Sequence, residues 1–167
     1  MKLANEYWNQ ISSYEKCVEQ KIIPGIIADA RNRGYLLKEE FITIGCWKST
    51  RPKPRYQQNS EDDVKCLTKV ALSPDSSRKD ALAALDTLNG VALRTATAIL
   101  HWFRDDTPIL DMRVVRALDG KFSKISSNWE NIELYQEVAD LIIRETRRVG
   151  VDLRTMDRAL WTWDKLH

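Results

Sequence analysis

Apolar residues recur three and four positions apart along most of this chain, which is the spacing of amphipathic helices. One segment shows the pattern with four residues: Val64, Leu67, Val70 and Ala71. The alternation typical of strands is absent, apart from a short β-like run at residues 41–44. The sequence therefore predicts an all-α fold.

The same signal places the expected helices along the chain. They are expected at residues 4–18, 21–33, 38–46, 78–88, 92–103, 129–149 and 154–165. Ser60 and Asp111 are expected to open two more, the second running through Leu118, because short polar side chains accept hydrogen bonds from the first backbone N–H groups of a helix. Pro52 and Pro54 indicate a loop over residues 48–59.

Size and composition exclude several classes of protein. The chain has 167 residues, of which 43% are hydrophobic, so we expect one folded domain over residues 1–167 rather than a disordered chain. No apolar run approaches the roughly 20 residues that cross a bilayer, and the first ten residues do not resemble a secretory signal. We expect a cytoplasmic protein without a membrane partner.

Cysteine and histidine usage argues against a metal or a disulfide framework. The three cysteines, Cys17, Cys46 and Cys66, are isolated, which is typical of a chain in a reducing compartment. Only two histidines are present, so we expect no histidine-based metal site.

Charge is nearly balanced overall but uneven along the chain. The net charge of +2 does not by itself indicate a nucleic-acid partner. Residues 47–55, the basic segment, contain four cations and no acid: Lys48, Arg51, Lys53 and Arg55. We expect these cations to add nonspecific affinity for a nucleic-acid backbone, and one interpretation of Trp47 is that it stacks on a base. The alternative is a solvated loop with Trp47 in the core.

Residues 85–118 carry the most specific pattern. Two expected helices are joined by the hairpin loop Leu88–Ala92, where Gly90 permits a positive φ and close backbone approach. The second helix then begins with backbone N–H groups that lack intrahelical acceptors, which is an arrangement that binds phosphate. Arg94 and Thr95, in its first turn, are expected to add side-chain donors.

This stretch resembles the helix-hairpin-helix DNA glycosylases of base-excision repair, the group that includes endonuclease III-like and 8-oxoguanine glycosylases. The resemblance is carried by Leu88, Gly90, Val91, Thr95, Ala96 and Ile99, followed by Pro108, Asp111, Val114, Val115 and Arg116. It is only architectural outside residues 85–118.

The resemblance implies a two-lobed helical protein that acts on a damaged or modified base in double-stranded DNA. The lobes would be residues 1–50 plus 120–167, and residues 51–119. Asp111 would be the catalytic carboxylate that stabilises the oxocarbenium-like sugar after the base is flipped out of the stack. DNA contacts would come from the hairpin residues Gly90, Val91, Ala92, Arg94 and Thr95.

Three departures from the family pattern limit what it implies. Ala92 replaces the second hairpin glycine, and alanine at a positive φ costs about 1 kcal/mol. Arg94 stands where lyase-active relatives carry a lysine nucleophile, so only monofunctional hydrolysis is expected. The cysteine pattern of an iron–sulfur cluster is absent, so we expect no cofactor.

Other interpretations of the same residues remain open. Asp111 can serve simply as the N-cap of the helix that follows it. The chain can also be a non-catalytic helix-hairpin-helix module that binds DNA or a protein. A third possibility is a helical protein without any nucleic-acid partner, which would show no affinity for DNA even at low salt.

Overall fold

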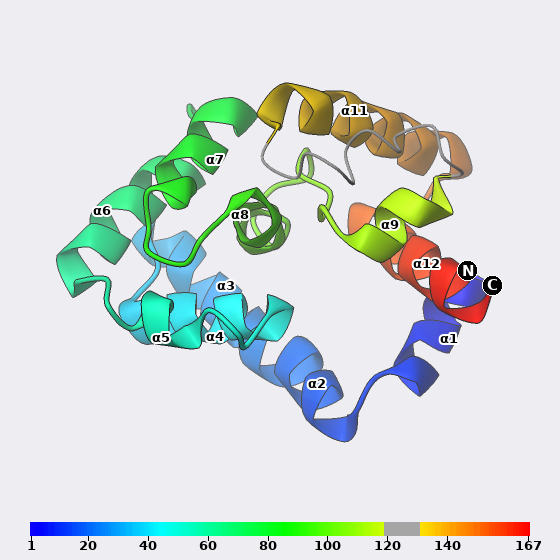
Figure 1. The fold of residues 1–167 in the computed structure, drawn as a ribbon, viewed down its shortest axis with the longest axis horizontal. Coiled ribbons are helices and arrows are strands. Elements are labelled where there is room, and N and C mark those ends of the chain that lie inside the picture. Colours follow the sequence, from blue (N-terminus) through cyan, green and yellow to red (C-terminus); the bar gives the residue numbers. More distant parts are fainter. Residues whose placement is uncertain (119–130) are drawn as a thin grey trace. The chain divides into compact units, whose positions relative to one another are not determined.

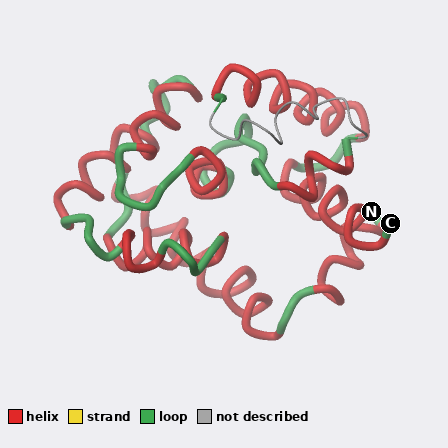
Figure 2. The backbone as a smooth tube through the Cα atoms, viewed as in Figure 1, coloured by secondary structure: helices red, strands yellow, loops and turns green. Residues whose placement is uncertain are grey.

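The structure, a computed structural model, describes residues 1–118 and 131–167, and these ranges contain helices and no strand (Figures 1 and 2). The predicted all-α class is therefore confirmed for the described residues. Residues 129 and 130, the first of the helix expected over 129–149, lie outside them.

Contacts divide the chain into two compact units. The terminal unit contains residues 1–12 and 105–167, and the central unit contains residues 13–104. The sequence instead suggested boundaries between the two lobes after residues 50 and 119. The observed division places residues 13–50 in the same unit as the hairpin loop, and it places Asp111 in the other unit.

The central unit is built around α8. Seven of the eight residues of this helix are buried, and Arg94 is the exception. A helix that is apolar or small on all sides is stable only inside a core, and here α4 and α7 contact it. The helices of this unit are α2 Ser13–Cys17, η1 Val18–Ile22 (a π-helical turn), α3 Ile23–Arg33, α4 Lys38–Lys48, α5 Lys53–Tyr56, α6 Glu61–Leu72, α7 Arg78–Asp86 and α8 Leu93–Leu100.

The terminal unit is organised by α12, which contacts α1, α9 and α11. The ring of Tyr7 on α1 meets Trp161 on α12 edge-on, with the ring centroids 5.3 Å apart. Tyr135, buried on α11, donates a hydrogen bond of 2.8 Å to the carbonyl of Pro108. The helices of this unit are α1 Lys2–Gln10, α9 Met112–Ala117, α11 Ile132–Val149 and α12 Leu153–Leu166.

Both predicted N-caps are confirmed. Ser60 Oγ accepts a hydrogen bond of 3.0 Å from the N–H of Asp63 at the start of α6. Asp111 Oδ1 accepts one of 2.9 Å from the N–H of Arg113 at the start of α9. Local side-chain chemistry therefore sets where these two helices begin.

Three expected elements differ from the structure. The helix expected over residues 4–18 is interrupted, because Ile11 is extended (φ −113°, ψ 156°) and α2 starts at Ser13. The loop expected over residues 48–59 contains α5, whose first turn holds Pro54, a position where proline costs no hydrogen bond. The helix expected over 92–103 is shorter, since α8 ends at Leu100.

Candidate nucleic-acid interface

The hairpin loop Leu88–Ala92 turns at Gly90. This glycine has a φ of 84°, and the N–H of Val91 donates to the carbonyl of Leu88 at 3.0 Å. Ala92 lies in the extended region (φ −117°, ψ 171°), not at a positive φ. The prediction that Ala92 strains this loop is therefore wrong.

The N-terminus of α8 has no side-chain cap. Ala92 occupies the N-cap and has no side-chain acceptor, whereas Ser or Asp caps α6, α7, α9 and α12. The first intrahelical bonds of α8 run from the N–H groups of Thr95 and Ala96 to the carbonyl of Ala92. The two preceding N–H groups have no acceptor within the helix, and their partial positive charge favours an anion.

The side chains expected to touch DNA in the hairpin fall into two groups. Val91 and Thr95 are both 7% exposed, so their side chains belong to the core. Arg94 is half-buried and is the one α8 side chain that reaches the surface. Of the expected hairpin contacts, the structure leaves the backbone at Gly90 and Ala92 and the side chain of Arg94 accessible.

Asn59 joins the hairpin loop to the chain that follows the basic segment. Its Oδ1 accepts the N–H of Asn89 at 2.7 Å, and its Nδ2 donates to the carbonyl of Asn89 at 3.1 Å. The same Nδ2 donates to the carbonyl of Tyr56 at 3.0 Å. Asn59 is 3% exposed, and a buried amide with this many partners fixes both segments in one arrangement.

Tyr56 fills the space between α4 and the hairpin loop. A Cβ placed on Gly45 would lie 2.9 Å from Tyr56 Cε2, and one placed on Gly90 would lie 3.0 Å from Tyr56 Cδ1. The ring is fully buried and meets Phe41 edge-on, with centroids 5.5 Å apart. Burial raises the pKa of Tyr56, and the neighbouring Thr95 hydroxyl opposes that rise. Both glycines are thus required by close packing against one ring.

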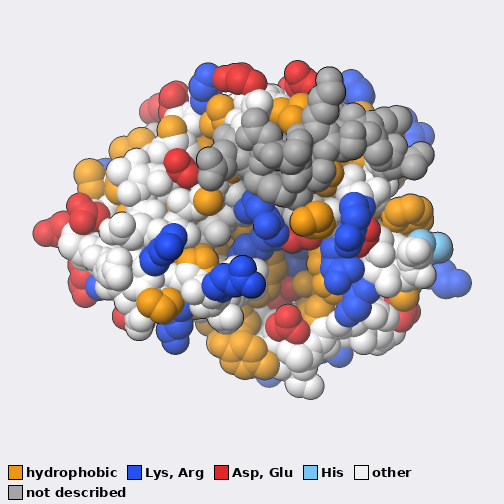
Figure 3. Space-filling model, viewed as in Figure 1, with side chains coloured by type: hydrophobic (Ala, Val, Ile, Leu, Met, Phe, Trp, Pro, Cys, Tyr) orange, Lys and Arg blue, Asp and Glu red, His pale blue; other side chains and the backbone are white. Residues whose placement is uncertain are grey.

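The basic segment is therefore held beside the hairpin loop. Arg51, Lys53 and Arg55 are exposed and Lys48 is half-buried. Lys and Arg side chains reach the surface over the part of the central unit that Figure 1 labels α4 and α5 (Figure 3). Trp47 is half-buried and meets Trp102 edge-on, with centroids 5.1 Å apart, which agrees with the packed interpretation rather than with a free stacking platform.

Sequence reasoning identified the four cations and the hairpin but not the residues that connect them. Asn59 lies 30 positions before Asn89, Tyr56 lies still earlier in the chain, and neither belongs to a recognisable motif. Their only signal is the pair of glycines at 45 and 90, which becomes informative once the Tyr56 ring is seen to contact both positions.

Asp111 lies in the terminal unit, at the start of α9. One carboxylate oxygen is used by the N-cap hydrogen bond, and the residue is partly exposed. This geometry confirms the N-cap interpretation. A carboxylate that caps a helix is also held in one orientation, which is what stabilising a developing positive charge requires.

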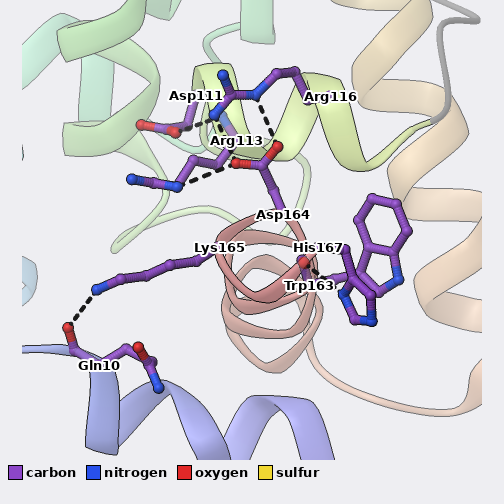
Figure 4. Close-up of polar contacts among 8 residues, drawn as sticks. All are labelled: Gln10, Asp111, Arg113, Arg116, Trp163, Asp164, Lys165 and His167. Atoms are coloured by element: carbon purple, nitrogen blue, oxygen red, sulfur yellow. Dashed lines mark hydrogen bonds and ion pairs between the residues drawn. The ribbon is translucent and has the colours of Figure 1, made fainter.

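Asp164 on α12 is the carboxylate that fixes α9 (Figure 4). It accepts hydrogen bonds from Arg116 and from Arg113, whose Nη1 lies 3.2 Å from Oδ2. The Asp164 side chain is only 8% exposed, and the hydrogen bond from Arg116 holds its pKa below the usual range. The Arg113 guanidinium also lies over the ring of Trp161, 5.1 Å from its centroid. The sequence alone did not indicate Asp164.

Neither a metal site nor a membrane span is evident in residues 1–118 and 131–167. These ranges contain no group of three His, Cys, Asp or Glu side chains arranged to hold a metal ion. Cys17, Cys46 and Cys66 are all free thiols. Among the described helices, none is both long enough and apolar enough to cross a membrane.

Comparisons with known proteins give no match. No protein-family model matches the chain, and neither the curated proteins nor the solved structures give a significant match. The hairpin loop, the basic segment and Asp111 are therefore the features on which a function can be based.

Proposed function

We propose that this chain binds double-stranded DNA through the hairpin loop and the basic segment of the central unit. The observation that supports this most directly is the pair of hydrogen bonds from Asn59 to the backbone of Asn89. They hold a cationic segment beside a glycine turn and an uncapped helix N-terminus. Backbone amides and arginine or lysine side chains are the groups with which proteins most often bind phosphates.

Binding of this kind is mainly electrostatic and does not read sequence. Each phosphate neutralised by a cation releases counterions, so the affinity falls steeply as salt rises. The exposed cations at 51, 53 and 55 and the half-buried cations Lys48 and Arg94 provide such contacts. We expect similar affinity for unrelated duplex sequences.

We further propose that the chain is a monofunctional DNA N-glycosylase with Asp111 as its catalytic carboxylate. Support comes from the resemblance over residues 85–118 and from the N-cap hydrogen bond that fixes the Asp111 side chain. In this mechanism the carboxylate stabilises positive charge that develops on the sugar of a flipped damaged or modified nucleotide. Arg94 stands where a Schiff base would need the amine of a lysine, so no Schiff base and no strand cleavage are expected.

A non-catalytic helix-hairpin-helix module is the second candidate. The observation in its favour is that the N-cap role of Asp111 already accounts for an acidic residue at this position. In this case the DNA contacts of the central unit would be the same and no base would be released.

The deciding experiment is fluorescence anisotropy with two labelled duplexes over a salt series. One duplex is unmodified and the other carries a stable abasic-site analogue. Tighter binding to the abasic duplex supports the glycosylase, because it reports a pocket for a flipped nucleotide. Equal, salt-sensitive binding to both supports the non-catalytic module, and no binding at low salt overturns the DNA proposal.

A further inference from the structure

We infer that Arg55 binds the phosphate next to the one held by the hairpin loop, and that Asn59 is the residue that positions Arg55 for this contact. The inference rests on the proposed DNA binding and adds a specific ligand and a positioning residue to it. It singles out one of the four cations of the basic segment, whereas charge alone would treat them as equivalent.

Arg55 contacts the turn of the hairpin loop. A Cβ placed on Gly90 would lie 2.8 Å from Arg55 Cβ, so the base of the arginine side chain touches the loop backbone. Arg55 is an exposed residue, so its charge is available to a ligand at this place on the surface. Arg55 is therefore placed to meet a backbone that approaches Gly90.

Asn59 links Arg55 to the hairpin loop. Its Nδ2 lies 3.4 Å from the carbonyl of Arg55 and 3.1 Å from the carbonyl of Asn89. A single buried amide group thus contacts the backbone of both segments. The N–H of Gln58 also donates to the Arg55 carbonyl at 3.1 Å, which closes the turn after α5. Loss of the Asn59 amide removes the bridge and leaves the charge of Arg55 unchanged.

Holding Arg55 in place should increase its contribution to binding. A cation that is already held in place loses less conformational freedom when it meets a phosphate than one on a free loop. The contribution of Arg55 to affinity then depends on Asn59. Two residues that act through one contact give non-additive losses when both are changed, whereas independent residues give additive ones.

The test measures the affinity for an unmodified duplex at low salt with Arg55→Ala, Asn59→Ala and the double variant. Arg55→Ala should weaken binding several-fold. It should also reduce the slope of log affinity against log salt concentration by about one, the amount expected for one lost phosphate contact. Asn59→Ala should weaken binding as well. The affinity of the double variant should be about equal to that of whichever single variant binds less tightly. Additive losses would overturn the positioning role of Asn59.

Two control variants separate this effect from general loss of charge or of an amide. Gln58→Ala removes an exposed amide from the same turn, and Lys21→Ala removes an exposed cation on η1 of the same unit. Both should leave the affinity nearly unchanged. Thermal unfolding of each variant shows whether it is folded at the temperature of the binding measurement.

A second comparison uses only variants of exposed residues. It therefore tests the assignment of Arg55 even if the Asn59→Ala variant does not fold. Arg55→Ala should weaken binding more than Lys53→Ala, although both remove one exposed charge from the same segment. Equal losses would overturn the assignment of Arg55. If the wild-type chain binds no duplex at low salt, the proposed function itself fails, and this outcome is distinct from the failure of Arg55 or Asn59.

Discussion

Arg116 donates two hydrogen bonds to Asp164, from Nε to Oδ1 and from Nη2 to Oδ2, and each is 2.7 Å long. This bidentate pair joins α9 to α12 across 48 positions of sequence. A helix of six residues such as α9 is not stable in isolation, so its position depends on contacts of this kind. Because Asp111 is the N-cap of α9, the orientation of its carboxylate depends in turn on Asp164.

Asp164→Asn should destabilise the terminal unit. The amide keeps the shape of the side chain but removes the negative charge that Arg113 and Arg116 share. We expect the melting temperature to fall by several degrees in a thermal scan followed by circular dichroism. Glu137→Gln, which removes an exposed carboxylate from α11 of the same unit, should have little effect. Equal melting temperatures for the two variants would contradict the role of Asp164.

The contribution of Asp164 to stability should disappear at acidic pH. The hydrogen bond from Arg116 lowers the pKa of Asp164 in the folded state relative to the unfolded chain. A lowered pKa stabilises the fold above the unfolded value of about 4, and this stabilisation is lost as the pH falls through the folded value. The difference in melting temperature between wild type and Asp164→Asn should therefore be full at pH 7 and shrink below about pH 4. A difference that grows on acidification would refute this linkage.

Three Gly→Ala variants should separate backbone strain from steric conflict. Gly25→Ala, in α3 with no atom within 4 Å of a new Cβ, should be neutral or stabilise by up to about 1 kcal/mol. Gly34→Ala, with a φ of 83° and open space, should lower the free energy of unfolding by about 1–2 kcal/mol. Gly90→Ala has a similar φ and also places a Cβ 2.8 Å from Arg55 Cβ, so it should cost more. Urea unfolding measures all three, and an equal cost at Gly34 and Gly90 would mean that the loop relaxes around the new methyl group.

Asp111→Asn should abolish base release and leave DNA binding in place. Asparagine caps helices as well as aspartate does, so α9 should remain folded and only the charge is lost. Base release is followed with duplexes that carry damaged or modified bases, and binding with the unmodified duplex. Release at the wild-type rate by this variant would remove Asp111 from the mechanism.

Arg94→Glu should weaken binding to all duplexes about equally. The substitution reverses the charge of the one α8 side chain that reaches the surface, close to the uncapped N-terminus of that helix. A phosphate contact carries no sequence information, so the loss should not depend on the duplex. Competition assays with several sequences test this expectation, and an unchanged affinity would exclude Arg94 from the interface.

Local chemistry in the sequence was sufficient for the helical class and for several helix boundaries. Apolar spacing identified the buried face of α7, where Ala81, Leu82 and Leu85 are all buried. Ser60 and Asp111 marked the starts of α6 and α9, because an N-cap acts on backbone groups only two or three residues away. Gly90 marked a turn that needs a positive φ. Each of these signals involves neighbours in the chain.

The contacts that matter most for the candidate interface were decided by the tertiary structure. Asn59 and Asn89 are 30 positions apart, and Arg116 and Asp164 are 48 apart. Nothing in the spacing of apolar residues specifies which buried polar group pairs with which distant backbone or charge. The extended conformation of Ala92 was not indicated by the family pattern either, although it is the usual conformation of an N-cap residue. The sequence by itself determined the helical class and several helix starts, and the folded chain decided which distant residues meet.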